Sequence, residues 1–140
     1  MVKNLNTKFL KVLKNNDFNE FLNLLKMMNK ESLSFNKSLN SNNDTLLHIL
    51  TIDDYDITFL KIYVNFIKRY NIKLNFNCKN KNLETPLHLL MIRDDLLLNR
   101  NDIHKIYYFF TQNNADQTCK DIVGITPRDS YLFRRILFKF

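Results

Sequence analysis

The 140-residue chain has one glycine, two prolines, two cysteines and no tryptophan. Because glycine and proline form the turns between strands, their scarcity argues against a β-sandwich or barrel. Two cysteines are too few for a secreted disulfide framework or, alone, for a four-ligand zinc site. No apolar run reaches the roughly 18 to 20 residues of a membrane span, and we expect no signal peptide because lysines interrupt the apolar residues of the N-terminus. We therefore expect a single all-α domain in a reducing, cytoplasmic location.

The chain is basic, with 21 lysine and arginine residues against 14 acidic residues and a formal net charge of +7. Such a charge favours binding to nucleic acid or an anionic surface when the cations converge on one face. The cations are spread along the sequence, and residues 61–81 are the densest stretch. We interpret them as a solvated helix face and keep binding of nucleic acid or an anionic surface as the alternative function.

A nine-residue pattern occurs three times, with starts about 40 residues apart. The first copy, residues 40–48, is Asn-Ser-Asn-Asn-Asp-Thr-Leu-Leu-His, and the second, residues 80–88, is Asn-Lys-Asn-Leu-Glu-Thr-Pro-Leu-His. The third copy, residues 121–129, is Asp-Ile-Val-Gly-Ile-Thr-Pro-Arg-Asp. A threonine at this place can cap a helix, and a proline after it suits the first helical position. The capping threonines and the prolines are Thr45, Thr85, Thr126, Pro86 and Pro127.

The pattern resembles the ankyrin-repeat signature, in which Asp or Asn, then Gly three residues later, then x-Thr-Pro-Leu-His open the first helix of each unit. Residues 85–88 keep all four letters of Thr-Pro-Leu-His, with Leu87 expected to point into the core. Asp121 and Gly124 supply the other two letters. The resemblance implies that His48 and His88 hydrogen-bond across neighbouring turns, which makes them structural.

Apolar residues spaced three, four, seven and eight apart predict a second helix in each unit. One spans about residues 57–70, and another contains residues 103–110 with Asp102 as its N-cap. In the resemblance, residues 113–116, Asn-Asn-Ala-Asp, replace the Gly-Ala-Asp that follows the second helix. Asparagine suits that place because it tolerates the left-handed backbone conformation.

The predicted fold is an ankyrin-repeat solenoid of about four helix-turn-helix units with atypical ends. The first unit is a degenerate capping repeat, because its helical pair lacks Thr-Pro-Leu-His, and the last is truncated. The predicted units are residues 5–30, 40–76, 80–118 and 121–140.

The units exceed the family's 33-residue period, and Leu83 and Leu46 replace its turn glycine and its proline. The extra length falls near residues 68–76, after a second helix, and at residues 93–100, between two helices. The inserted loops either carry function or reflect neutral drift.

We predict no catalytic residue, metal site or cofactor site, because no nucleophile and base or converging carboxylates stand out. One glycine cannot build a phosphate-binding loop. The aspartates in residues 53–56 and 94–95 are interpreted as helix caps that dilute the positive charge, not as cation ligands. Cys78 and Cys119 hold equivalent positions in successive units and should lie too far apart for a disulfide.

The resemblance implies a non-catalytic module that binds or sequesters an intracellular protein, since stacked repeats have no natural pocket. The contact surface is expected on the exposed side of the first helices and on the turn tips Asn42, Lys81, Asn82 and Asp121. Many asparagines and lysines and a single alanine are typical of AT-rich genomes. The compact form looks like the ankyrin proteins of large DNA viruses and intracellular parasites. Some of these resemble IκB-type inhibitors of NF-κB, which implies a host factor as partner, in the host cytoplasm or nucleus.

Overall fold

The computed structural model describes residues 5–52, 54–93 and 99–138, which form helices and connecting loops without a strand. The prediction of an all-α chain is therefore confirmed for these residues. The helices are α1 (Leu5–Lys14), α2 (Phe18–Lys30), α3 (Leu46–Thr51), α4 (Ile57–Arg69), α5 (Pro86–Met91), α6 (Arg100–Gln112) and α7 (Pro127–Phe138).

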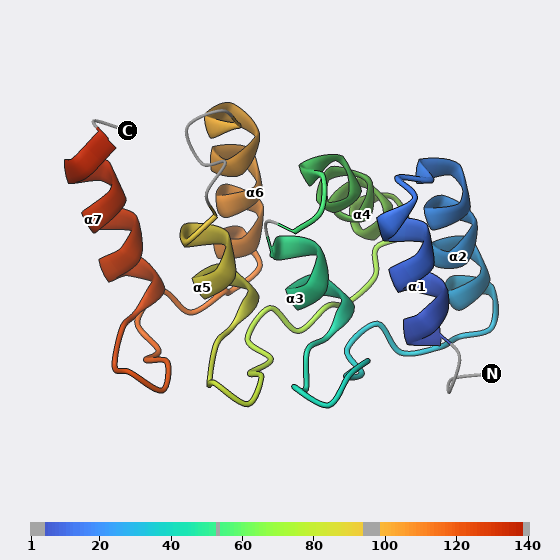
Figure 1. Cartoon of the computed structure of the whole chain (residues 1–140), viewed down its shortest axis with the longest axis horizontal. Coiled ribbons are helices and arrows are strands. Elements are labelled where there is room, and N and C mark those ends of the chain that lie inside the picture. The colour runs from blue at the N-terminus through green and yellow to red at the C-terminus, as the bar shows by residue number, and fades with distance from the viewer. Residues whose placement is uncertain (1–4, 53, 94–98, 139–140) are drawn as a thin grey trace.

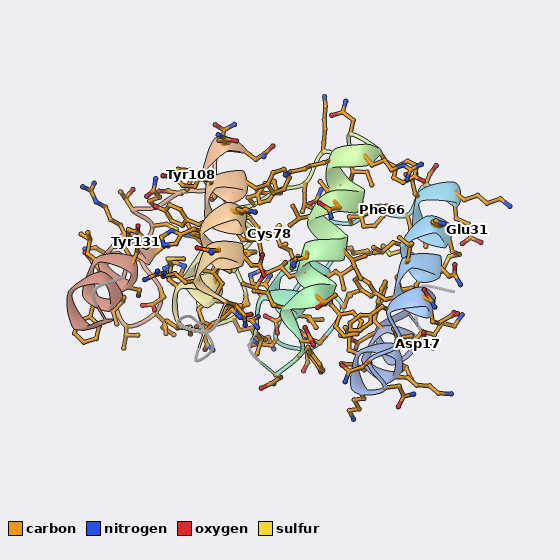
Figure 2. The ribbon with its side chains drawn as sticks, turned by 90° about the horizontal axis from the view of Figure 1, so that it is seen from above. Asp17, Glu31, Phe66, Cys78, Tyr108 and Tyr131 are labelled. Carbon is orange, nitrogen blue, oxygen red and sulfur yellow. The ribbon has the colours of Figure 1, made fainter. Side chains whose placement is uncertain are left out.

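The helices lie in two rows, with α1, α3, α5 and α7 in one and α2, α4 and α6 in the other (Figures 1 and 2). Helix α3 packs against α4 and α5, α4 also packs against α2 and α6, and α5 packs against α6 and α7. The loops that precede α3, α5 and α7 project from the same side of the molecule, at the bottom of Figure 1. Three turns far apart in the sequence are thereby brought to one edge.

Large apolar side chains join the helices into one core. The ring of Phe21 on α2 meets Phe9 of α1 and Phe59 of α4 edge-on, with centroids 5.8 and 5.1 Å apart. At the other end, Tyr107 of α6 stacks on Tyr131 of α7 with centroids 5.0 Å apart. Aromatic pairs of this kind contribute about 0.5–1.5 kcal/mol beyond the area that they bury.

A left-handed residue follows each helix of the second row. Ser32, Asn71 and Asn114 follow α2, α4 and α6 with φ of 54°, 50° and 69°. After α6 the N–H of Ala115 then donates to the carbonyl of Phe110 at 3.0 Å, which closes the helix end as in a Schellman motif. Asn114 thus adopts the conformation that was predicted for its segment.

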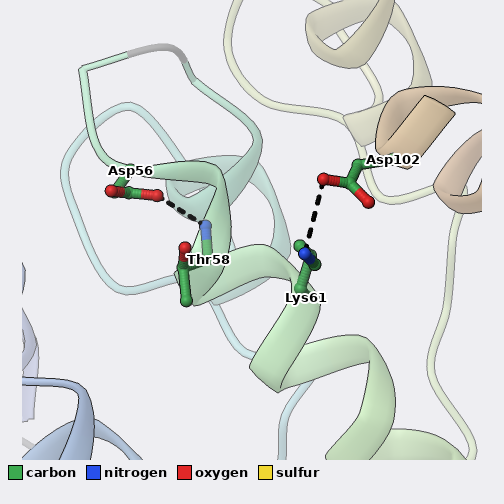
Figure 3. Close-up of polar contacts among 4 residues, drawn as sticks. All are labelled: Asp56, Thr58, Lys61 and Asp102. Carbon is green, nitrogen blue, oxygen red and sulfur yellow. Dashed lines mark hydrogen bonds and ion pairs between the residues drawn. The ribbon is translucent and has the colours of Figure 1, made fainter. Parts of the chain in front are cut away.

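The predicted starts of α4 and α6 have different outcomes. The predicted helix at about residues 57–70 is confirmed, and Asp56 caps it by accepting from the N–H of Thr58 at 2.9 Å (Figure 3). The prediction that Asp102 caps α6 is wrong, because the helix begins earlier and its N-cap is Asn99. Asp102 lies in the first turn of α6, where a carboxylate is favourable, and pairs with Lys61 at 3.3 Å (Figure 3).

Candidate interaction surface

We call residues 40–45, 80–85 and 121–126 the first, second and third turns. Each turn is closed by the side-chain oxygen of its first residue: Asn40, Asn80 or Asp121. That oxygen accepts from the backbone N–H groups two and four residues later, at 2.9–3.0 Å. Aspartate replaces asparagine here because the contact needs only an acceptor. The predicted tip residue Asp121 therefore has a structural role, and its side chain is partly buried.

The fourth residue of each turn is left-handed, with φ of 60° at Asn43, 58° at Leu83 and 88° at Gly124. A residue with a side chain loses about 1–2 kcal/mol in this conformation, whereas glycine does not. A Cβ at Gly124 would meet nothing within 4 Å, so the backbone and not the space favours glycine there. Leu83, which weakens the match to the signature, nevertheless adopts the same conformation.

Backbone hydrogen bonds join neighbouring turns edge to edge. The N–H of Lys81 donates to the carbonyl of Asn42, and the N–H of Ile122 donates to that of Asn82, both at 2.9 Å. In addition, Nδ2 of Asn80 donates a hydrogen bond to Oδ1 of the buried Asp44 at 3.1 Å. The predicted tip residues Asn42, Lys81 and Asn82 therefore lie together. The side chains of Lys81 and Asn82 are exposed, and that of Asn42 is partly buried.

The two motif histidines connect each helix start to the next turn. His48 Nδ1 accepts from the N–H of Thr45 at 3.1 Å, while Nε2 lies 2.9 Å from the carbonyl oxygen of Glu84. His88 repeats this with Thr85 at 3.0 Å and with the carbonyl of Ile125 at 3.0 Å. A backbone N–H can only donate and a carbonyl can only accept, so both rings are neutral with the hydrogen on Nε2.

Burial lowers the pKa of His48 below the ordinary 6.5, and the bond to the Glu84 carbonyl and the charge of Asp44 oppose the shift only in part. A second proton would have to enter at Nδ1, which would then lose its bond from Thr45. The neutral ring is therefore the form that accepts from Thr45 at the start of α3 while it donates to the Glu84 carbonyl of the next turn.

The threonine and proline of the motif start the helices that follow the turns. Thr85 caps α5 by accepting from the N–H of His88, Pro86 takes the first helical position and Leu87 is fully buried. Thr45 caps α3 in the same way. At the third turn the capping oxygen is that of Thr126, which accepts from a backbone N–H at 3.0 Å, and the buried Pro127 begins α7.

Exposed apolar side chains gather on the second and third turns. They are Leu83, Ile122, Val123 and Ile125, with exposed fractions of 43, 66, 77 and 45%. We call these four residues the tip patch. The bond between the Asn82 carbonyl and the Ile122 N–H brings the two turns together, so the four residues stand on adjoining turns. The predicted contact residues did not include these four, although isoleucine and valine at a loop tip were a visible signal.

The prediction that the first helices expose a contact face is wrong for α3 and α5. All six residues of each helix are buried. The reason is their position, because each short helix packs against its partner in the other row and against a neighbour in its own row. Only the turns therefore remain as the expected contact surface in this part of the chain.

Arg93 is another residue whose role the sequence did not indicate. Its side chain is 1% exposed and donates to the carbonyls of Thr51 and Ile52 at 3.2 Å and of Tyr55 at 3.4 Å. It thus holds the end of α5 against the loop after α3. The inserted loop was predicted over residues 93–100. Asp53 and residues 94–98 of that loop, with its two aspartates, lie outside the described residues.

Neither cysteine has the character of an activated nucleophile. Cys78 and Cys119 are free thiols, as expected, and burial raises the pKa of both, so less of each is thiolate at neutral pH. Within residues 5–52, 54–93 and 99–138, no three His, Cys, Asp or Glu side chains gather as metal ligands.

No family model and no curated protein matches this sequence. Among the helices described here, none is long and apolar enough to cross a membrane. The linked turns and their exposed side chains are therefore the basis for proposing a function.

Proposed function

We propose that the chain is an ankyrin-type repeat module, with units at residues 5–30, 40–76, 80–118 and 121–140, that binds an intracellular protein without catalysis. Three turns with one hydrogen-bond pattern support this proposal, as do the two histidines that join successive turns. Such units bury apolar side chains against the neighbouring units, so each unit depends on its neighbours for stability.

The tip patch is the observation that carries the binding role. The free energy falls when a partner removes exposed apolar side chains from water, and contiguous exposed patches mark interaction sites. The patch stands on turns that are fixed to each other, so little conformational entropy is lost on binding. Nucleic acid is bound mainly through cations that meet its phosphates and through aromatic rings that stack on its bases, and the tip patch has only aliphatic side chains, so it favours a protein.

The test replaces two tip-patch side chains by serine and measures which proteins the variant still binds. The variant is Ile122→Ser with Val123→Ser, and its matched control is Tyr108→Ser with Phe133→Ser, two exposed aromatic residues on α6 and α7. Wild type and both variants serve as baits in quantitative mass spectrometry of cell extracts. We expect partners of the wild type and the control to fall about tenfold or more with the tip variant. Equal retention by all three baits would remove the proposal.

A Rel-family dimer is the narrowest candidate partner, suggested by the resemblance to IκB-type inhibitors. Purified dimer titrated against the same variants tests it directly. Binding that the tip variant weakens and the control keeps supports this candidate. Lack of binding to the wild type removes it, while the bait experiment still decides on the tip patch.

A further inference from the structure

The row of α2, α4 and α6 forms a second surface, away from the turns. In Figure 1 the turns lie at the bottom, and Figure 2 shows this row from above. Two grooves run along it, one between α2 and α4 and one between α4 and α6. Asn65 of α4 lines both grooves, so they adjoin.

Both grooves combine apolar walls with basic rims. Leu22 and Ile62 line the α2–α4 groove, and Val64 and Ile106 line the α4–α6 groove. Five cations contribute to the two linings, namely Lys26, Lys61, Lys68, Arg69 and Lys105. Asp102 is the one carboxylate among the lining residues, and Lys61 already pairs with it at 3.3 Å (Figure 3). The surface therefore carries an excess of positive charge.

One cation of this surface is already held in place. Lys68 Nζ lies 4.8 Å from the centroid of the Phe109 ring, a cation–π contact between α4 and α6. A cation fixed in this way loses less side-chain entropy when an anion binds. The groove rim is thus partly prepared for a negatively charged group.

The size of the grooves argues for a peptide. Their volumes are about 270 and 130 Å³, below the roughly 300–1,000 Å³ of small-molecule sites. Each can accept side chains of a segment that lies across the helices. Nucleic acid would use the cations and leave the apolar walls unused, whereas a segment with alternating acidic and apolar residues uses both.

We propose that the surface of α2, α4 and α6 docks an acidic amphipathic segment of a protein partner. Its carboxylates meet Lys26 and Arg69 at one groove and Lys68 and Lys105 at the other, and its apolar side chains enter the grooves. The surface differs from the tip patch, so this docking does not depend on the proposed function.

The experiment measures fluorescence anisotropy with the purified full chain. The probe is a short labelled peptide that alternates Glu and Asp with Leu and Phe. A second peptide has serine in place of Leu and Phe, and the third probe is a single-stranded oligonucleotide of equal charge. We expect saturable binding of the amphipathic peptide. The affinities of the other two probes should be lower by at least about tenfold.

Charge-reversed variants locate the site. Lys68→Glu with Lys105→Glu should lower the affinity for the amphipathic peptide by about tenfold or more, because attraction becomes repulsion at one groove. The matched control, Lys37→Glu with Lys120→Glu, changes two exposed lysines outside the grooves and should alter binding by less than about threefold. Unchanged far-UV circular dichroism verifies that both variants fold.

The proposal would be overturned by equal weakening in both charge-reversed variants, by equal binding of the polar peptide, or by tighter binding of the oligonucleotide. The Ile122→Ser, Val123→Ser variant should keep full peptide affinity, because the tip patch lies on another edge (Figure 1). Loss of peptide binding in that variant would also contradict the docking surface proposed here. The two proposals can thus fail separately.

Discussion

Protonation of His48 should loosen the start of α3, where the His48 ring accepts from the N–H of Thr45. In the folded protein Nε2 carries the hydrogen that faces the Glu84 carbonyl at 2.9 Å. An added proton must therefore go to Nδ1, the atom that accepts from the N–H of Thr45 at 3.1 Å. Two donors would then face each other in a site where the ring is 0% exposed.

The size and sign of the effect follow from the lowered pKa of His48. Between this pKa and 6.5, the value in the unfolded chain, the unfolded state binds more protons than the folded state. His48 therefore contributes its full stability above pH 6.5 and loses it as the pH falls toward the folded-state pKa. At one pH unit below 6.5 the loss is at most about 1.4 kcal/mol. With a urea m-value of about 1–3 kcal/mol/M, the unfolding midpoint falls by at most roughly 0.5–1.4 M.

Urea unfolding at about pH 7.5, 6.5 and 5.5 measures this loss. His48→Gln should remove this loss of stability on acidification, because an amide can accept and donate but does not titrate in this range. The matched control, His104→Gln on α6, should keep it. A wild-type midpoint that stays constant or rises on acidification would refute the reasoning. An equal loss of stability on acidification in His48→Gln and the wild type would refute it as well.

Three substitutions test the packing and the turns by urea unfolding. Leu87→Ala should cost about 2–5 kcal/mol, because Leu87 is 0% exposed on a helix that packs against α3, α6 and α7. Tyr63→Phe should leave stability unchanged or raise it by up to about 1 kcal/mol, because the buried Tyr63 hydroxyl has no hydrogen-bond partner among the described residues. Gly124→Ala should cost about 1 kcal/mol from the left-handed backbone alone, since the added methyl meets nothing. An unmoved midpoint for Leu87→Ala or Gly124→Ala, or a loss above about 1 kcal/mol for Tyr63→Phe, would contradict the packing described here.

Local signals allowed much of the fold to be predicted. The caps at Thr45 and Thr85, and Asn114 after α6, act within a few residues of their own position, so the sequence pattern contains their cause. The start of α6 was misplaced because Asp102 is acidic in the first turn, and a first-turn carboxylate and an N-cap give similar sequence signals.

Features that depend on neighbouring units could not be predicted in this way. Arg93 is buried because the carbonyls of Thr51 and Ile52, about 40 residues away, accept from it. Helices α3 and α5 are buried on all sides by what packs around them, and their sequences, Leu-Leu-His-Ile-Leu-Thr and Pro-Leu-His-Leu-Leu-Met, are mostly apolar on every face, a signal that the prediction of an exposed face overlooked. The tip patch forms only when Ile122 comes next to Asn82 through the bond between turns.

The joining of the turns is the central claim, and hydrogen exchange of two tip amides tests it most directly. Lys81 and Ile122 are exposed, yet their N–H groups donate to the carbonyls of Asn42 and Asn82 in the preceding turns. Ser41 holds the corresponding place in the first turn, and its amide makes no backbone hydrogen bond to any described residue. We expect the amides of Lys81 and Ile122 to exchange at least about tenfold more slowly than that of Ser41, relative to their unfolded-chain rates. Equal exchange at all three amides would show that the turns are not joined and would contradict the account.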